Sequence, residues 1–453
     1  MNHYEVAIIG GGQAGVPLAY ALPRAGKRIV LIERKHLGGS CVNFGCAPTK
    51  AAIASARLAH LARRAAEFGL RIPSVEVDFA AVIQRARDIV AGQRSGIERG
   101  LTGKDNPRVI TAQARLDGRD GDRFRIVAGD ETVLADHVVL DTGTRSAIPP
   151  IDGIGGLDVI HAGNWLEHTD LPQRLIVIGG GVIALEMAQF YRRMGSEVVV
   201  IEALAQIAGS EDPDVAEALQ DLLEREGIEF HLEAKIDRVE KRGSGIVVQI
   251  AEKGAIAGTH LFVAAGRKAN TDDLGLDTVG VKMNRGIVEA DERLSTNVRG
   301  IWAAGDIRGG PMFTHTAWDD HRVLYSQIVG DRSRTTERVV PYAIFTDPEI
   351  GRVGMTETQA RKSGKQIKVA RFEIRRNSKS LEIGEPDGFI KVIADASNDQ
   401  LLGAMVMCNE AAELVHIYID LMNARAPFPV IRDAVYIHPT FAEAIQSAAT
   451  MLG

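Results

Sequence analysis

The chain has 453 residues, of which 45% are hydrophobic and 25% are charged, as in an ordinary soluble globular protein. This length exceeds what one hydrophobic core usually holds and favours three or four domains. A formal net charge of −6 gives no electrostatic reason to expect nucleic acid or an anionic membrane as a partner.

Cysteine content and the N-terminus indicate the compartment. Three cysteines, Cys41, Cys46 and Cys408, are too few for a secreted fold held by disulfides. The N-terminus lacks the basic segment and cleavage site of a signal peptide, and no apolar run approaches the roughly 18 residues of a membrane span. We therefore expect a cytoplasmic protein without a membrane segment.

The first predicted element is a buried strand over residues 5–10 that runs into the glycine-rich sequence GGGQAG. An apolar helix and a second strand over residues 28–33 complete a βαβ unit. Its glycines allow the backbone to approach a pyrophosphate at the helix N-terminus, and the acid at the second strand end can accept from ribose hydroxyls. The residues expected to bind this nucleotide are Gly10, Gly12, Gly15 and Glu33.

Two cysteines five positions apart follow this unit, in the sequence CVNFGC. On a regular helix a five-residue step rises roughly 7.5 Å, whereas a disulfide tolerates Cα atoms up to about 7 Å apart. A bridge between Cys41 and Cys46 would therefore need a distorted backbone, which Gly45 permits. Because a strained bridge is easily reduced, the spacing predicts a redox-active pair.

Long surface helices are predicted over residues 51–68 and 79–99, and short strands over residues 108–140. A second βαβ unit then begins with a strand over residues 174–179 and the turn GGGVIA. An acid at its second strand end favours a free ribose 2′-hydroxyl and so NAD(H) over NADP(H). The residues expected to bind this second nucleotide are Gly179, Gly181 and Glu202.

Three motifs carry a resemblance to a known family: GGSCVNFGCAPTK at residues 38–50, WAAGD at residues 302–306 and HPTFAE at residues 438–443. Together and in this order they resemble the flavoprotein pyridine nucleotide-disulfide oxidoreductases of class I. That family includes dihydrolipoamide dehydrogenase, glutathione reductase and mercuric reductase. The resemblance covers essentially the whole chain and implies FAD and NAD(H) as cofactors.

The resemblance implies an α/β fold with two doubly wound Rossmann-like nucleotide-binding domains and a C-terminal α+β dimerisation domain. The expected segments are 1–146 for the first part of the FAD-binding domain, 147–264 for the NAD-binding domain, 265–338 for a central domain that completes the FAD site, and 339–453 for the dimerisation domain.

The resemblance also implies a role for each catalytic residue. Cys46 would be the thiolate beside the flavin, and Cys41 the interchange thiol that meets the substrate. Lys50 would lie near the flavin ring and pair with Glu186. Further cofactor contacts are expected from Ser40, Thr142, Gly143, Gly266, Asp306 and Thr314.

His438 and Glu443 are the expected acid–base pair, because disulfide exchange needs a proton for the leaving thiol and imidazole titrates in the useful range. A carboxylate can hold one ring nitrogen so that the other faces Cys41. The resemblance implies that this pair completes the site of the partner subunit in a homodimer.

The function predicted from the sequence is an FAD-dependent dithiol–disulfide oxidoreductase most like dihydrolipoamide dehydrogenase, acting on a small or carrier-bound substrate. Val182, Glu202 and Ala208 favour it, because glutathione reductase has a tyrosine and two arginines there. The alternatives are a mercuric-reductase-like metal-ion or electrophile reductase and a redox-sensing flavoprotein without fast turnover. The sequence leaves the acceptor and the direction of electron flow open.

Two remaining features complete the expectations. Met405, Met407 and Cys408 alternate as in a packed strand, and no metal site is predicted. Asp141 stands at a strand end where the family usually has alanine, and the sequence offers no explanation for it.

Overall fold

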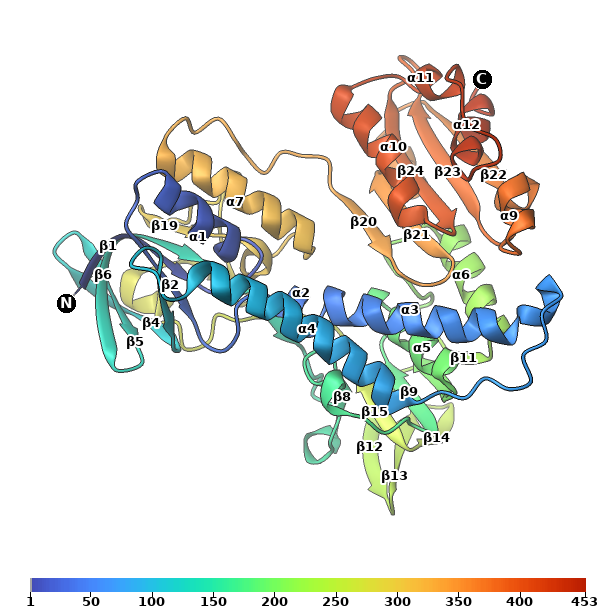
Figure 1. Cartoon of the computed structure of the whole chain (residues 1–453), viewed down its shortest axis with the longest axis horizontal. Coiled ribbons are helices and arrows are strands. Elements are labelled where there is room, and N and C mark those ends of the chain that lie inside the picture. Colours follow the sequence, from blue (N-terminus) through green and yellow to red (C-terminus); the bar gives the residue numbers. More distant parts are fainter. Residues whose placement is uncertain (1) are drawn as a thin grey trace.

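In the computed structural model, which describes residues 2–453, the chain forms three α/β bodies (Figure 1). Each body is built on one sheet of at least five strands. The helices α3 (Cys46–Arg63) and α4 (Phe79–Leu101) pack against each other and run from the N-terminal body to the second body (Figure 1). The third body carries the C-terminus and contacts the second through the loop before β21 (Glu349–Gly354).

The N-terminal body contains a seven-stranded sheet in the order β3-β2-β1-β6-β5-β4, with β19 paired to β6. Its central strands are buried on both faces, which explains their continuous apolar sequences. Helices α1 (Gly15–Arg24) and α7 (Thr314–Val329) cover one face. The strands are β1 (Asn2–Ile9), β2 (Ile29–Glu33), β3 (Arg108–Thr111), β4 (Ala114–Asp120), β5 (Arg123–Ala128), β6 (Glu131–Leu140) and β19 (Ile301–Ala303).

The second body repeats the strand–helix–strand arrangement of the first in a parallel sheet of order β11-β10-β9-β15-β8. A three-stranded antiparallel sheet, β12-β13-β14, packs on one of its faces. The elements are β8 (Ile160–His161), β9 (Arg174–Ile178), α5 (Val182–Met194), β10 (Glu197–Ile201), α6 (Pro213–Arg225), β11 (Ile228–His231), β12 (Ile236–Arg242), β13 (Gly245–Ile250), β14 (Gly254–Gly258) and β15 (His260–Val263).

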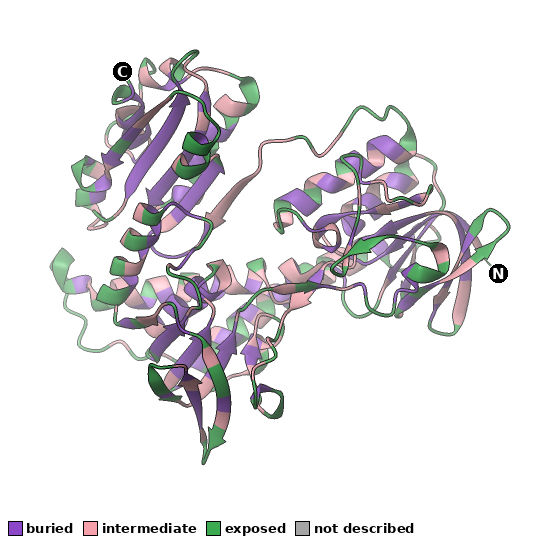
Figure 2. Ribbon diagram, turned by 180° about the vertical axis from the view of Figure 1, so that it is seen from behind, coloured by how far each residue is buried: buried purple, intermediate pink, exposed green. Residues whose placement is uncertain are grey.

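The third body is an antiparallel sheet of order β20-β21-β24-β23-β22 with helices on its faces. Figure 2 shows its central strands buried, and Met405, Met407 and Cys408 are packed inside as predicted. Its other elements are β20 (Pro341–Ile344), α8 (Glu357–Lys362), β22 (Ile367–Glu373), α9 (Ser378–Glu382), β23 (Phe389–Asp395), β24 (Leu401–Cys408), α10 (Ala411–Ala424), α11 (Pro429–Arg432) and α12 (Ala442–Thr450).

Short strands return the chain from the second body to the first. β7 (Thr144–Ser146) pairs with β16 (Arg267–Ala269), so the segments on either side of the second body lie side by side. The hairpin β17 (Met283–Asn284) and β18 (Ile287–Val288) follows. The α/β fold class predicted from the sequence is confirmed. On this connectivity we propose the four-segment domain division given above.

The helix predicted over residues 51–68 is present as α3, but its bounds and its placement on the surface were wrong. It begins at Cys46, ends at Arg63 and is followed by a short 3₁₀ turn. Ala51, Ala52 and Ala56 are buried on it, because their small side chains let α3 pack closely against α4 and α5. None of the helices in residues 2–453 combines the length and apolar character that crossing a bilayer requires.

Candidate active site

The two cysteines lie on different helices. Cys41 is inside the short helix α2 (Gly39–Asn43), and Cys46 is the first residue of α3. A Cβ on Gly45, between them, would lie 2.8 Å from the carbonyl oxygen of Ser40 and 3.3 Å from the Cα of Cys41. Glycine is therefore needed there for the close approach of the two helices, and the expected backbone distortion is a break between them.

The Cys46 thiol is surrounded by groups that favour its charged form. Its Sγ lies 3.2 Å from Oγ1 of Thr314, the first residue of α7. A hydrogen bond from Cys41 lowers the pKa of Cys46 to about 6, with further contributions from Thr314 and Lys50. The same hydrogen bond and burial raise the pKa of Cys41. In the reduced pair the thiolate at neutral pH therefore resides on Cys46.

Lys50 connects the cysteine helix to both other bodies. Its Nζ lies 2.7 Å from Oε2 of Glu186 on α5, and 4.4 Å from the centre of the Phe345 ring. Oε1 of Glu186 accepts a hydrogen bond of 2.9 Å from the backbone N–H of Phe345. Because Glu186 is buried and paired on both oxygens, the Lys50 ammonium is fixed one helical turn from Cys46.

The first glycine-rich turn has the shape of a phosphate cradle. Gly10 has φ +107°, and a Cβ there would lie 2.1 Å from the carbonyl oxygen of Asp141. Gly15 begins α1, whose N-terminal N–H groups therefore open toward the turn. Glu33 accepts hydrogen bonds from the N–H groups of Gly11 and Lys35, at 2.8 and 2.9 Å, which fixes its carboxylate beside the turn. These residues fit an adenosine diphosphate group.

The second turn repeats this arrangement at the start of α5. Gly179 has φ +108°, and a Cβ on Gly181 would meet no atom of the described chain within 4 Å, so open space remains above the turn. Glu202 accepts hydrogen bonds from the N–H groups of Gly180 and Leu204. The turn and the fixed carboxylate fit a second nucleotide.

The residues expected along the rest of the flavin lie near β7 and the WAAGD motif. Oδ2 of Asp306 accepts a hydrogen bond of 2.9 Å from Thr144 and lies 3.8 Å from Arg267. Thr142 donates to the carbonyl of Asn270 at 2.8 Å. The remaining predicted contacts lie on the adjoining turns, at Ser40 on α2 and at Gly143 and Gly266, both of positive φ.

His438 and Glu443 are brought together across the start of α12. Nδ1 of His438 donates to Oε1 of Glu443 at 3.0 Å, and the N–H of Thr440 and His438 lower the pKa of that carboxyl. Nε2 stays free, since within residues 2–453 His438 bonds to Glu443 alone and not to either cysteine. Val435 and Ile437 are 99% and 79% exposed, so this apolar segment faces away from its own body.

Two residues that support the site, Asn43 and Trp165, were not predicted from the sequence. Asn43 is buried, and its amide donates to the carbonyls of Leu37 and Gly39, which fixes the start of α2. Trp165 donates from its indole N–H to the carbonyl of Phe44 at the break between the cysteine helices. These contacts join segments far apart in sequence, and no local pattern could have revealed them.

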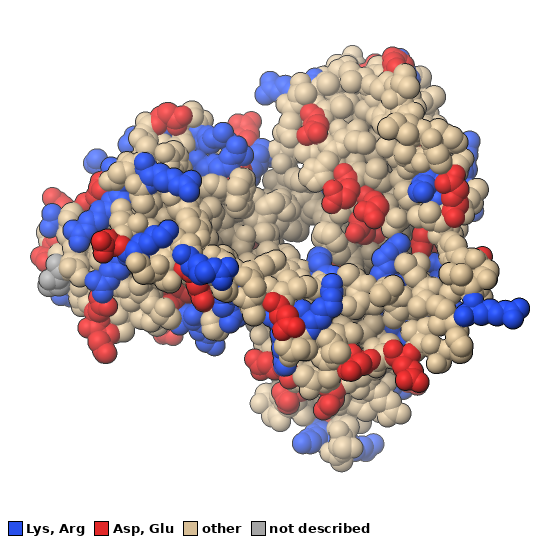
Figure 3. Space-filling model, in the orientation of Figure 1, with Lys and Arg blue, Asp and Glu red and all other residues tan. Residues whose placement is uncertain are grey.

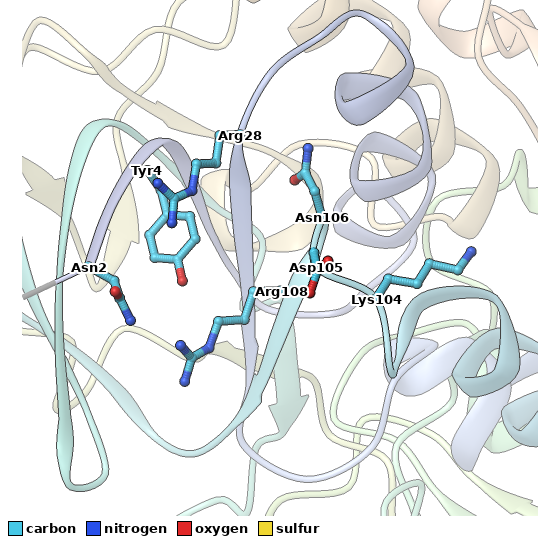
Figure 4. Close-up of a pocket in the computed structure, with 7 residues that line it drawn as sticks. All are labelled: Asn2, Tyr4, Arg28, Lys104, Asp105, Asn106 and Arg108. Carbon is cyan, nitrogen blue, oxygen red and sulfur yellow. The ribbon is translucent and has the colours of Figure 1, made fainter.

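Two surface features lie apart from these residues. The pocket in Figure 4 is at the amino ends of β1 and β3, and no predicted site residue lines it. Its basic side chains are Arg28, Lys104 and Arg108. On the face drawn in Figure 3, basic and acidic side chains are interspersed.

Removing the Thr314 hydroxyl is expected to shift the titration of Cys46. In Thr314→Val the side chain keeps its shape but no longer donates to the thiolate, so the pKa of Cys46 rises. Alkylation of Cys46 in the reduced protein, followed by mass spectrometry against pH, should show an alkaline-shifted midpoint. Thr102→Val, at the exposed C-terminal end of α4 and far from the sulfur, is the control; identical midpoints for Thr314→Val and wild type would refute the role of the hydroxyl.

Comparison with known proteins decides the family. A family model described as pyridine nucleotide-disulphide oxidoreductase matches residues 4–320, and a model of the dimerisation domain of that family matches residues 340–449. The chain belongs to the pyridine nucleotide-disulphide oxidoreductase family. The family resemblance noted in the sequence is thereby confirmed.

Relatives of this flavoprotein family match over nearly their whole length. The probable pyridine nucleotide-disulfide oxidoreductase RclA of Escherichia coli is 31% identical and covers 100% of both chains. A dihydrolipoyl dehydrogenase of Cupriavidus necator is 32% identical over 99% of this chain and 98% of the relative. The solved Cu(II) complex of RclA, described as an HOCl-induced flavoprotein disulfide reductase, has a TM-score of 0.91 at 31% identity over 100% of both chains.

Membership of this family fixes the chemistry in outline. The protein is an NAD(H)-dependent flavoprotein disulfide oxidoreductase, and its cofactors are FAD and NAD(H). The two glycine-rich turns described above fit these two dinucleotides. The cofactor and enzyme-class predictions made from the sequence are confirmed.

Proposed function

We propose that the protein oxidises a small or carrier-bound dithiol, in the manner of a dihydrolipoamide dehydrogenase, by exchange with a Cys41–Cys46 disulfide. A substrate thiolate attacks Sγ of Cys41, which breaks the disulfide and releases Cys46 as a thiolate. The second substrate thiol then attacks the mixed disulfide, the substrate leaves as a disulfide, and Cys41 is freed. His438 of the partner subunit accepts one of the two protons that the substrate thiols lose, and the other ends on Cys41, which is released as a thiol while Cys46 stays a thiolate.

The observation that carries this proposal is the asymmetry of the thiol pair. Cys46 has a pKa of about 6 beside Thr314 and Lys50, which suits a leaving group and an electron-rich sulfur. When bound, FAD supplies two-electron transfer between this sulfur and the nicotinamide. Lys50, held by Glu186, stabilises negative charge at this end of α3. The dihydrolipoyl dehydrogenases among the relatives support a lipoyl-type dithiol as substrate.

The proposal includes a two-subunit site. The match to the dimerisation domain supports a homodimer, and we place His438 and Glu443 of each subunit at the partner subunit's cysteines. The exposed Val435 and Ile437 beside His438 favour burial of this segment against a second copy. We propose a cytoplasmic location, in line with the low cysteine content.

Reduction of a soft metal ion is the second candidate function. It is favoured by the similarity to RclA, which was solved as a Cu(II) complex. Thiolates are the ligands that soft cations prefer, so the reduced Cys41 and Cys46 could hold such an ion as substrate. Within residues 2–453 of one chain, no group of three or more His, Cys, Asp and Glu is arranged to hold a metal.

The deciding experiment is a steady-state acceptor and donor screen with the FAD-loaded homodimer. Dihydrolipoamide with NAD should give the highest kcat/KM, above NADH with low-molecular-weight disulfides, mercuric ion or Cu(II). A kcat/KM for a metal ion that exceeds the value for dihydrolipoamide would reverse the order of the two candidates.

Nicotinamide selection should depend on Glu202. Its carboxylate is fixed beside the second turn by two N–H donors, where it can accept from a ribose 2′-hydroxyl and would repel a 2′-phosphate. In Glu202→Ala the ratio of kcat/KM for NADH over NADPH should fall at least about tenfold. Glu197→Ala, at the exposed start of the same strand, is the matched control; an unchanged ratio in Glu202→Ala would disprove the assignment.

A further inference from the structure

Asp141 places a buried carboxyl group inside the first nucleotide cradle. It follows the last residue of β6 and is itself only 6% exposed. Its Oδ2 accepts a hydrogen bond of 2.7 Å from the N–H of Gly15, the first residue of α1. The carboxyl group thus lies at the N-terminus of α1, beside the turn that would take the pyrophosphate of FAD.

The other carboxyl oxygen faces the second segment of the flavin site. A Cβ on Gly305 would lie 3.0 Å from Oδ1 of Asp141, and a Cβ on Gly12 would lie 2.7 Å from Oδ2. Gly305 immediately precedes Asp306 of the WAAGD motif. Asp141 therefore lies between the phosphate turn and the segment expected at the ribitol, and both glycines are needed to make room for it.

Three other carboxyl groups lie around this cradle, and two of them have cationic partners. Asp320 on α7 lies 3.2 Å from Arg308 and 2.6 Å from Arg338, and it accepts from the N–H of Gly305. Asp306 lies near Arg267 and Thr144, as described above. Glu33 on β2 is held by backbone N–H groups.

Asp141 has no such compensation. Among residues 2–453 no lysine, arginine or histidine forms an ion pair with it. Burial raises its pKa well above the ordinary value, and the charges of Asp306 and Asp320 act in the same direction against the N–H groups of Gly15 and Ala14. A bound pyrophosphate adds further negative charge nearby and disfavours ionisation still more.

We propose that Asp141 holds FAD as a neutral carboxylic acid, and that its ionisation weakens the hold of the protein on this cofactor. As a neutral acid, Asp141 accepts from the Gly15 N–H through one oxygen and has a hydroxyl to donate to a phosphate oxygen through the other. As a carboxylate it would place an unpaired negative charge against the pyrophosphate. The glycine-rich turn alone binds any dinucleotide, whereas Asp141 makes this turn sensitive to pH.

The direction of the pH effect follows from linkage. FAD raises the pKa of Asp141, so binding takes up a proton in the pH range between the pKa of the FAD-free form and that of the FAD-bound form. Within that range the apparent Kd for FAD increases with pH, by up to tenfold per pH unit. Below it, both forms are protonated and Kd is constant.

The test measures FAD release from the purified holoprotein by the recovery of free flavin fluorescence, from about pH 6 to about pH 10. The wild-type Kd should rise with pH. In Asp141→Asn the amide keeps an acceptor for Gly15 and a donor for phosphate but cannot ionise, so its Kd should be tight and independent of pH. Asp122→Asn, an exposed acid in the turn between β4 and β5, should keep the wild-type slope.

A wild-type Kd that does not vary with pH would overturn the proposal without any variant. So would parallel profiles of wild type and Asp141→Asn. If Asp141→Asn folds poorly, Asp141→Ala replaces it; it should also lack pH dependence, but with a higher Kd at low pH because the phosphate donor is lost. Thermal unfolding with and without added FAD gives a second readout, because a ligand that binds only the folded state raises the Tm.

Discussion

In Cys46→Ser, kcat for dithiol oxidation is expected to fall by about 10³-fold or more. A serine hydroxyl cannot form the disulfide with Cys41, and it stays protonated at neutral pH, so neither step of the proposed exchange can proceed. The measurement is steady-state NADH formation from dihydrolipoamide and NAD. FAD content should stay close to that of wild type, because the flavin cradle is built from other segments.

Cys41→Ser should lose dithiol activity to a similar extent, because without the sulfur of Cys41 the same disulfide cannot form. Cys408→Ala is the matched control, because Cys408 is the third cysteine and is buried in β24. Its activity should stay within about twofold of wild type at temperatures where it is folded. Dithiol turnover near wild type in Cys46→Ser would refute the mechanism.

His438→Ala is expected to lower kcat for dithiol oxidation by about 10²- to 10⁴-fold, the usual contribution of a positioned acid–base group. Glu443→Gln should lower kcat by a smaller factor, because the imidazole remains and only the hydrogen bond that orients Nδ1 is weakened. His3→Ala, which removes another histidine paired with a carboxylate, is the control. If the physiological substrate is a metal ion, the effect of His438→Ala on its reduction should be small.

Mixed dimers test whether the site is shared between subunits. A heterodimer of Cys46→Ser and His438→Ala subunits has one site with both functional groups intact, so random exchange should restore about a quarter of wild-type activity. Restoration would be absent if His438 served the cysteines of its own chain. The mixture therefore distinguishes a site shared between two subunits from a site within one subunit, although each parent variant is inactive on its own.

Much of this architecture could be predicted because local sequence specifies it. The turns at Gly10 and Gly179 need positive φ, so each glycine-rich sequence between a buried strand and a helix indicates a nucleotide cradle. Lys50 and Glu186 were paired through the family resemblance, and the structure brings them to 2.7 Å. Glu443 reaches His438 although their spacing does not match a helix face, because His438 precedes α12.

The remainder depends on contacts between distant segments. The first residue of α7 meets Cys46, 268 residues away, and that hydroxyl helps to set the pKa of the thiol. The buried face of α3 was missed because alanines give little apolar signal, although they pack closely. Asp141 could not be explained from its own strand, since its partner is the N–H of Gly15, 126 residues earlier.

Anaerobic titration of the FAD-loaded protein with NADH tests the central claim most directly. If the Cys46 thiolate lies against the flavin, one equivalent of NADH should produce a long-wavelength charge-transfer absorbance and two titratable thiols, and Cys46→Ser should give neither. Immediate bleaching of the flavin in the wild-type protein, with no charge-transfer band and no new thiols, would contradict the account.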